Sequence, residues 1–416
     1  MATGAILVFL IAIVAARFIN WGIYTWAYFA RKLGPWAAAP EGCQRKWTDH
    51  LPVVGWLLLR REVGKSDVNT KGFWIRPLLI EAVFPILVTG YYCAYTAGWM
   101  FPAVYQTLPG FPDAARTHQL QWQFSGHFIL FVLMTIATFI DFDEHSIPDY
   151  VTIPGAIIGV MGAAFAGAWL PFSPVLPPPG ALELHAALPV DWPPVFDGIA
   201  GLWIGLGILA LWGFALLERR WITRRGYKKA LEYFFAKLFR RKSIWITVLA
   251  SMLFMMGITT YVYFNENPGR WTYLLSSLLG MAFAAGITWG VRISASVGLG
   301  VEALGFGDVT LMAMIGTYIG WQPSLLVFFL APLIAILFVL VRWAITGDPL
   351  TPYGPYLCAA TVAVFVFWNE IWFGWAAPLF VIGPDMIVGI VAACVALMGV
   401  MLWIWRLIKQ ALGFAH

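Results

Sequence analysis

The chain has 416 residues, of which 61% are apolar and 11% are charged. Soluble domains are about 25% charged, so this composition excludes an ordinary soluble protein. The 23 Trp, 31 Phe and 15 Tyr residues and a mean hydropathy of +0.77 indicate a polytopic membrane protein instead. The four cysteines are scattered and form no Cys-x-x-Cys pair, which argues against a zinc knuckle or a disulfide framework.

Apolar runs close to the length of about 20 residues that crosses a bilayer predict an all-α bundle of about eleven transmembrane helices. The first run lacks the basic start of a signal peptide, so we interpret it as a retained helix. The run at 309–320 is the shortest. In chain order the runs cover 5–29, 77–99, 125–141, 150–169, 197–217, 244–265, 273–293, 309–320, 324–345, 355–374 and 380–405.

The Lys and Arg residues predict the orientation of these helices. Nine of the 26 lie in 30–76, ten lie in 218–243, and four more are Arg292, Arg342, Arg406 and Lys409, all on one side of the predicted membrane. By the positive-inside rule the N-terminus is outside and the C-terminus is cytoplasmic. The net charge of +5 then reflects topology and contact with membrane lipid headgroups, and we expect no nucleic-acid partner.

Two connecting segments have a distinctive composition. The loop 218–243 repeats apolar residues at helical spacing among its basic residues, which predicts an amphipathic helix on the membrane surface. The segment 170–196 is rich in proline and has no Lys or Arg, which predicts an irregular spacer.

Two groups of acidic residues lie at the predicted cytoplasmic boundary. Asp141, Asp143 and Glu144 end the third apolar run, and Asp308 opens the eighth. An ionisable group at membrane depth costs about 2.5–3.5 kcal/mol, so such a group is a functional candidate. Two carboxylates that face each other share one proton, and aspartic proteolysis requires this state. The alternative is structural: Asp308 as a helix N-cap and the other carboxylates as a solvated helix end.

Three motifs in order along the chain resemble one known family. Gly305-Phe306-Gly307-Asp308 resembles the GxGD motif of the prepilin peptidases, or type IV leader peptidases, which are intramembrane aspartic proteases. Asp141 followed by Ile147-Pro148-Asp149 resembles the family's other aspartate signature. The segment Pro352–Leu357 resembles the family's Pro-x-Gly-Pro-Tyr-Leu sequence.

The resemblance assigns roles to residues of this chain. Asp141 and Asp308 carry over as the catalytic pair, and Asp143 is the main rival for the first position. Proteolysis of this kind needs no metal and no cofactor. The supporting positions are Gly305, Gly307, Pro148 and Asp149.

The amino-terminal part is similar to the region that bifunctional members use to methylate the new amino terminus with S-adenosylmethionine. Asn20, Arg76 and Glu81 are the candidate residues there. Cys43 is the one cysteine of that loop, so the family's tetracysteine zinc site is absent and we expect no metal. Ala16-Arg17 replaces the family's Gly-Ser, and the methyltransferase activity is therefore left open.

The family typically has eight transmembrane helices, and this chain is predicted to have more. We divide it into N-terminal helices with a basic loop, the first-aspartate helices, an inserted loop and helix hairpin, the GxGD helices and an extra C-terminal helix. These segments are 1–124, 125–217, 218–293, 294–374 and 375–416.

The predicted function is that of a multi-pass inner-membrane aspartic endopeptidase. It would cleave the leader of type IV prepilins or pseudopilins at the cytoplasmic face, with methylation as a further step. Two alternatives remain: a transporter coupled to its intramembrane carboxylates, and an inactive family member acting as an assembly partner.

Overall fold

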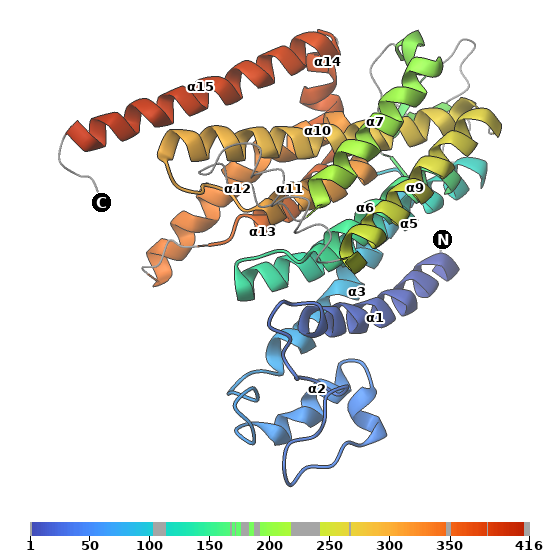
Figure 1. Cartoon of the computed structure of the whole chain (residues 1–416). Helices are drawn as coiled ribbons and strands as arrows, with labels where there is room; N and C mark the ends of the chain where they lie inside the picture. The colour runs from blue at the N-terminus through green and yellow to red at the C-terminus, as the bar shows by residue number, and fades with distance from the viewer. Residues whose placement is uncertain are drawn as a thin grey trace.

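The computed structural model describes residues 2–102, 114–166, 169–170, 172–175, 183–186, 192–217, 242–265, 268–346, 351–380 and 382–411. Over these residues the chain is a bundle of long helices with a small lobe at one end (Figure 1). The predicted all-α class is confirmed. Of the basic loop 218–243, predicted to be an amphipathic helix, residues 218–241 lie outside the described residues.

Every predicted apolar run coincides with a helix. Among the described residues, eight helices are long and apolar enough to cross a membrane, or nine if the bent pair Gly354–Val366 and Asn369–Phe380 is one span. Two further apolar helices are shorter, so the count of eleven crossings and the orientation remain predictions. The helices are α1 (Ala2–Thr25), α2 (Val54–Leu59), α3 (Ile75–Thr96), α5 (Ala114–Glu144), α6 (Asp149–Ala166), α7 (Ile199–Leu216), α9 (Lys242–Asn265), α10 (Pro268–Leu299), α11 (Phe306–Ile319), α12 (Trp321–Thr346), α13 (Gly354–Val366), α14 (Ala377–Phe380) and α15 (Pro384–Ala411).

The Pro-rich segment differs from its prediction. Instead of an irregular spacer throughout, it contains an antiparallel pair, β1 (Phe172–Val175) with β2 (Glu183–Ala186). A two-stranded ribbon satisfies part of the backbone of an extended segment. It tolerates Pro174 because each strand of a pair has an unpaired edge.

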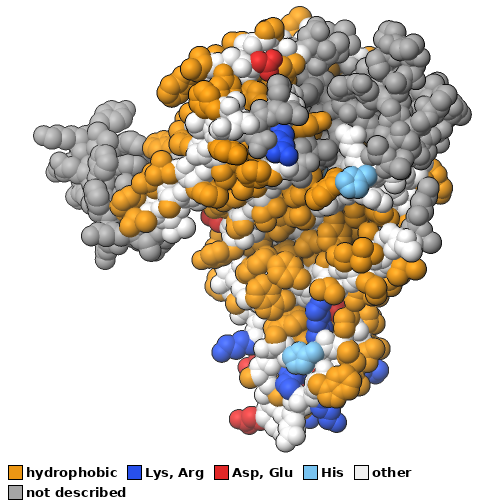
Figure 2. Space-filling model, turned by 90° about the vertical axis from the view of Figure 1, so that its right-hand side faces the viewer, with side chains coloured by type: hydrophobic (Ala, Val, Ile, Leu, Met, Phe, Trp, Pro, Cys, Tyr) orange, Lys and Arg blue, Asp and Glu red, His pale blue; other side chains and the backbone are white. Residues whose placement is uncertain are grey.

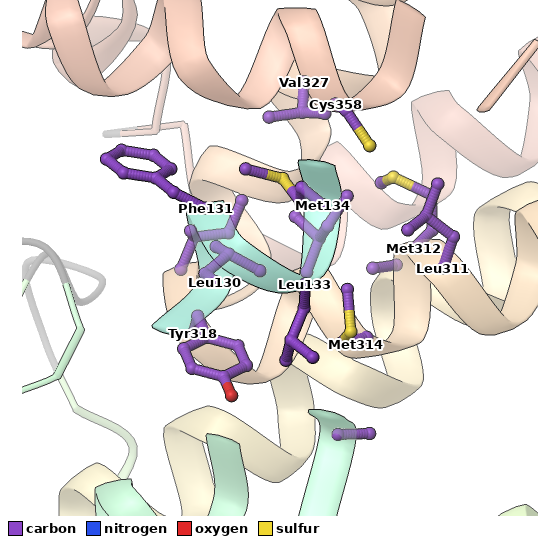
Figure 3. Packing of buried hydrophobic residues seen from close by; sticks show 14 of the residues in the cluster. Leu130, Phe131, Leu133, Met134, Leu311, Met312, Met314, Tyr318, Val327 and Cys358 are labelled. Carbon is purple, nitrogen blue, oxygen red and sulfur yellow. The ribbon is translucent and has the colours of Figure 1, made fainter. Parts of the chain in front are cut away.

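Helix α11 is the centre of the bundle. Its residues from Asp308 to Ile319 are all buried, which is why it needs no hydrophilic face. Glycines allow its neighbours to approach closely: a Cβ on Gly316 would lie 2.3 Å from the Gly280 carbonyl oxygen in α10, and one on Gly159 of α6 would lie 2.0 Å from Thr317 Oγ1. Figure 3 shows Leu133 of α5 close to Met314 of α11, both within the buried core.

Residues 26–74, between α1 and α3, form the lobe at the bottom of Figure 1. It contains α2 and two 3₁₀ turns, η1 (Trp47–His50) and η2 (Arg60–Glu62). Lys and Arg side chains gather there in Figure 2, whereas the side of the bundle above it is largely apolar. Buried carboxylates hold the lobe together: Asp49 accepts a hydrogen bond from Arg61 at 2.6 Å, and Glu62 pairs with Arg45.

Helix α15 contacts the bundle through α10. The packing is close because a Cβ on Gly298 would lie 2.8 Å from the Gly399 carbonyl oxygen, and Ser294 Oγ donates to the Val395 carbonyl at 2.7 Å. The rest of α15 is exposed: 6% of its most apolar stretch is buried. This surface is the one expected to face lipid.

Candidate active site

Asp141 lies in the last turn of α5 with 4% of its surface exposed. The helix ends at Glu144, and His145 adopts a φ of +52° as the chain turns toward α6. The buried Pro148 then precedes the first residue of α6, Asp149, which is exposed. A proline before a helix restricts the chain to an extended approach, so this turn fixes where α5 ends.

Asp308 lies in the first turn of α11 with 8% of its surface exposed. The preceding Gly305 is extended, with φ −68° and ψ 151°, which starts the helix at Phe306. Gly307 meets the α5–α6 turn: a Cβ there would lie 3.1 Å from Ile147 Cβ and 3.2 Å from the Ile147 backbone N and O. The second glycine of the motif therefore lets the two aspartate-bearing segments come into contact.

Thr152 and Thr310 hold the same two segments in register. Thr152 Oγ1 of α6 donates to Thr310 Oγ1 of α11 at 3.1 Å, and Thr310 Oγ1 donates to the Gly307 carbonyl at 3.0 Å. Both threonines are fully buried.

Gly354 brings a third segment to Asp141. Its N–H, at the start of α13, donates to Asp141 Oδ2 at 3.1 Å. A Cβ at this position would lie 2.6 Å from that oxygen and 2.7 Å from Ile147 Cδ1, so no larger residue fits without displacement. The segment Pro352–Leu357, found by resemblance, thus supplies a hydrogen-bond donor to the first aspartate.

The two aspartates are close enough to interact electrostatically, although 166 residues separate them along the chain. Tyr353, just before α13, lies beside them: burial and then the charge of Asp308 raise the pKa of its phenol, which therefore stays protonated. The arrangement unites two buried carboxyl groups, a backbone N–H and a neutral hydroxyl. Such a pair can hold one proton between two carboxylates.

Asp143 and Glu144 belong to a different set of contacts. Asp143 makes two hydrogen bonds with Arg76, at 2.7 and 2.9 Å, and lies 3.5 Å from Arg31. Glu144 accepts the backbone N–H groups of Tyr28 and Phe29, each at 2.9 Å. Asp143 therefore attaches the end of α5 to α3 and to Arg31 of the lobe, and Glu144 attaches it to the lobe.

The three residues predicted for methylation do not form one cluster. Asn20 Nδ2 donates to Glu81 Oε1 at 3.1 Å, whereas Arg76 turns to Asp143 and to the Tyr24 hydroxyl. Glu81 Oε1 also accepts hydrogen bonds from Arg17 at 3.0 Å and Trp56 at 2.8 Å, and Oε2 accepts the Val53 N–H at 2.6 Å. A carboxylate has about four acceptor positions, so this one is filled by the chain itself.

S-adenosylmethionine would need polar groups that it can reach. Glu81 and Asn20 are 1% and 0% exposed, and the donors to Glu81 all come from the chain. The set Asn20, Arg76 and Glu81 therefore does not fit a cofactor site as it stands, and no methylation step is derived from it. Within the described ranges, no three His, Cys, Asp or Glu side chains gather as metal ligands would.

Two contacts of the buried carboxylates are not predicted from the sequence. Gly354 lies within the segment Pro352–Leu357, but that motif alone does not identify it as a partner of Asp141. Arg17 lies within the first apolar run, and a cation at that depth is the signal in the sequence for its partly buried ion pair with Glu81.

The fold and the site define a multi-pass membrane protein with two buried aspartates at meeting helix ends. Residues 241–340 match the model of the type IV leader peptidase family, a segment that includes α9, α10 and Asp308. The match confirms the resemblance over a segment that contains the GxGD motif, whereas Asp141 and Pro352–Leu357 lie outside it.

Two curated relatives are similar to the chain over a limited length. One, from Pseudomonas aeruginosa, is 35% identical over 107 residues, and another, from Aeromonas salmonicida, is 31% identical over 108 residues. Both are named prepilin leader peptidase/N-methyltransferase. The matches cover 25% and 22% of this chain and 37% of each relative, so the chain spans well under half of their length in these alignments. No solved structure matches.

Proposed function

We propose that this protein is an aspartic endopeptidase of the cytoplasmic membrane that cleaves the leader of type IV prepilins or pseudopilins at the cytoplasmic face. One observation carries the proposal: Asp141 and Asp308 are both buried and are brought together by the contact of Gly307 with Ile147. The family match over 241–340 and the names of the two relatives support it.

The proposed reaction uses the pair in two protonation states. The ionised carboxylate takes a proton from water, and the water oxygen attacks the scissile carbonyl, which the protonated carboxyl group polarises. As the amide bond breaks, the leaving nitrogen receives a proton from the carboxyl group that took it from water, which restores the pair. The Gly354 N–H holds Asp141 Oδ2 in place and leaves the other oxygen for the reaction.

The contacts of Asp143 favour Asp141 as the first aspartate. Asp143 is held by Arg76 through both oxygens, so each of its oxygens already has a cationic partner. Asp141 has no cationic neighbour of that kind among the described residues. The Asp141 carboxyl group is therefore the better one to share a proton with Asp308.

The test is a gel-shift assay in membranes that contain this protein and a candidate prepilin. Wild type should remove the leader, Asp141→Asn and Asp308→Asn should not, and Asp143→Asn should retain cleavage. Leader removal by both Asp141→Asn and Asp308→Asn would reject the proposal. Carboxylate-dependent ion flux without cleavage would favour the transporter, and pilus assembly that survives both substitutions would favour the inactive partner.

Methylation by S-adenosylmethionine is supported by the resemblance of the amino-terminal part and by the names of the two relatives. The filled Glu81 cluster gives it no support in this chain. Mass spectrometry of the mature amino terminus tests for methylation, because a methyl group adds a fixed mass to the first residue.

A further inference from the structure

A small polar pocket lies where the lobe meets the start of α3, outside the aspartate pair. It has a volume of about 260 Å³ and is lined by Arg31, Lys71 and Arg76 together with Tyr24, Thr70 and Gly72. No carboxylate belongs to its lining. We propose that this pocket binds a phosphate group, supplied by the headgroup of an anionic membrane phospholipid.

The charges of the pocket favour an anion. Asp143, from the end of α5, pairs with Arg76 and Arg31 and compensates one of the three positive charges. Among the residues that the structure describes, Lys71 has no ion pair, so two charges remain. Asp143 and the Tyr24 hydroxyl accept three of the five N–H groups of the Arg76 guanidinium, so two donors remain for an anion without release of Asp143.

The position of the pocket favours a lipid as the source of the phosphate. It lies beyond the end of α1, Thr25, and beside the start of α3, Ile75, which are the ends of two candidate membrane spans. Apolar residues next to its lining residues in the sequence are exposed: Phe29 is 80% exposed, Tyr28 57% and Ile75 45%. Basic side chains beside exposed apolar ones are typical of a surface that contacts anionic headgroups.

The experiment measures binding, so its result is independent of proteolysis. The full chain in zwitterionic detergent is titrated with dioctanoyl phosphatidylglycerol, with the phosphatidylcholine of the same chain length and with inorganic phosphate, and bound molecules are counted by native mass spectrometry. We expect saturable binding of phosphatidylglycerol to one site. Arg31→Gln and Lys71→Gln should each weaken it about tenfold, because a hydrogen bond to a charged group is lost.

Lys32→Gln is the matched control. Lys32 is exposed, adjoins Arg31 and does not line the pocket, so its loss removes the same charge from the same surface. The proposal is overturned if Lys32→Gln weakens binding as much as the pocket variants, if those variants bind like wild type, or if phosphatidylcholine binds equally well. Displacement of the lipid by inorganic phosphate at equal concentration would assign the pocket to a soluble phosphate and reject the lipid source. Both pocket residues are exposed, so the variants should fold.

Discussion

Two buried carboxylate sites in this protein differ in how their oxygens are used. Glu81 accepts hydrogen bonds from Arg17, Asn20, Trp56 and the Val53 N–H, so the chain fills its acceptor positions. Asp141 receives the Gly354 N–H, and no cation pairs with it or with Asp308 within the described part of the chain.

The difference separates a structural carboxylate from one available for chemistry. A filled, ion-paired carboxylate contributes stability and is hard to replace. A buried pair with unused oxygens is destabilising for the fold and retains the capacity to bind water and share a proton. The tests below ask whether the two sites respond to substitution in opposite ways.

The largest expected effect on activity is at the aspartate pair. Asp141→Asn and Asp308→Asn should each lower the rate of leader cleavage by at least about 10²–10⁴-fold, the range for loss of a general acid or base. Thermal stability in detergent should stay the same or rise, because the amide removes a buried charge. Loss of folded protein in either variant would show that the aspartates, like Glu81, are structural groups.

The largest expected effect on stability is at Glu81. Arg17→Met should destabilise the protein by about 3–5 kcal/mol, because it leaves a buried carboxylate without its cation. The variant Arg17→Met/Glu81→Met should recover part of that loss, and thermal unfolding measures both. The control is Glu302→Gln at the exposed Arg292–Glu302 pair, which should change stability by less than about 1 kcal/mol. Equal shifts at the buried and exposed pairs would contradict this distinction.

Gly354→Ala should affect both properties. Its Cβ would lie 2.6 Å from Asp141 Oδ2, so we expect a loss of stability of about 1–3 kcal/mol together with slower cleavage. Gly207→Ala in α7 is the control, since nothing lies within 4 Å of its Cβ and alanine favours a helix. Full cleavage by Gly354→Ala would show that Asp141 does not depend on this contact.

The smallest expected effect is at Asp143. Asp143→Asn weakens the contact of α5 with Arg76 but leaves Asp141 and Asp308 in place, so cleavage should fall by less than about tenfold. The gel-shift assay compares it directly with Asp141→Asn. A larger loss of cleavage in Asp143→Asn than in Asp141→Asn would identify Asp143 as the first catalytic aspartate.

The sequence predicted the helices better than their contacts. Apolar runs mark each helix because the bilayer requires about 20 apolar residues, and this signal is local. The meeting of Asp141 with Asp308 was predicted from motifs and from orientation, whereas the donor Gly354 depends on a packing contact across 213 positions. The pairing of Arg76 with Asp143, and of Arg17 with Glu81, could not be read from spacing, since each joins different helices.

The attachment of α15 bears on the order in which the protein is built. Gly290, Ser294 and Gly298 recur at four-residue intervals along α10, and Gly399 of α15 meets this row. Small residues at that spacing join independently inserted helices within a bilayer. Because α11 and the aspartates are enclosed by other helices, the bundle can assemble first, and α15 can dock afterwards as a separate lateral association.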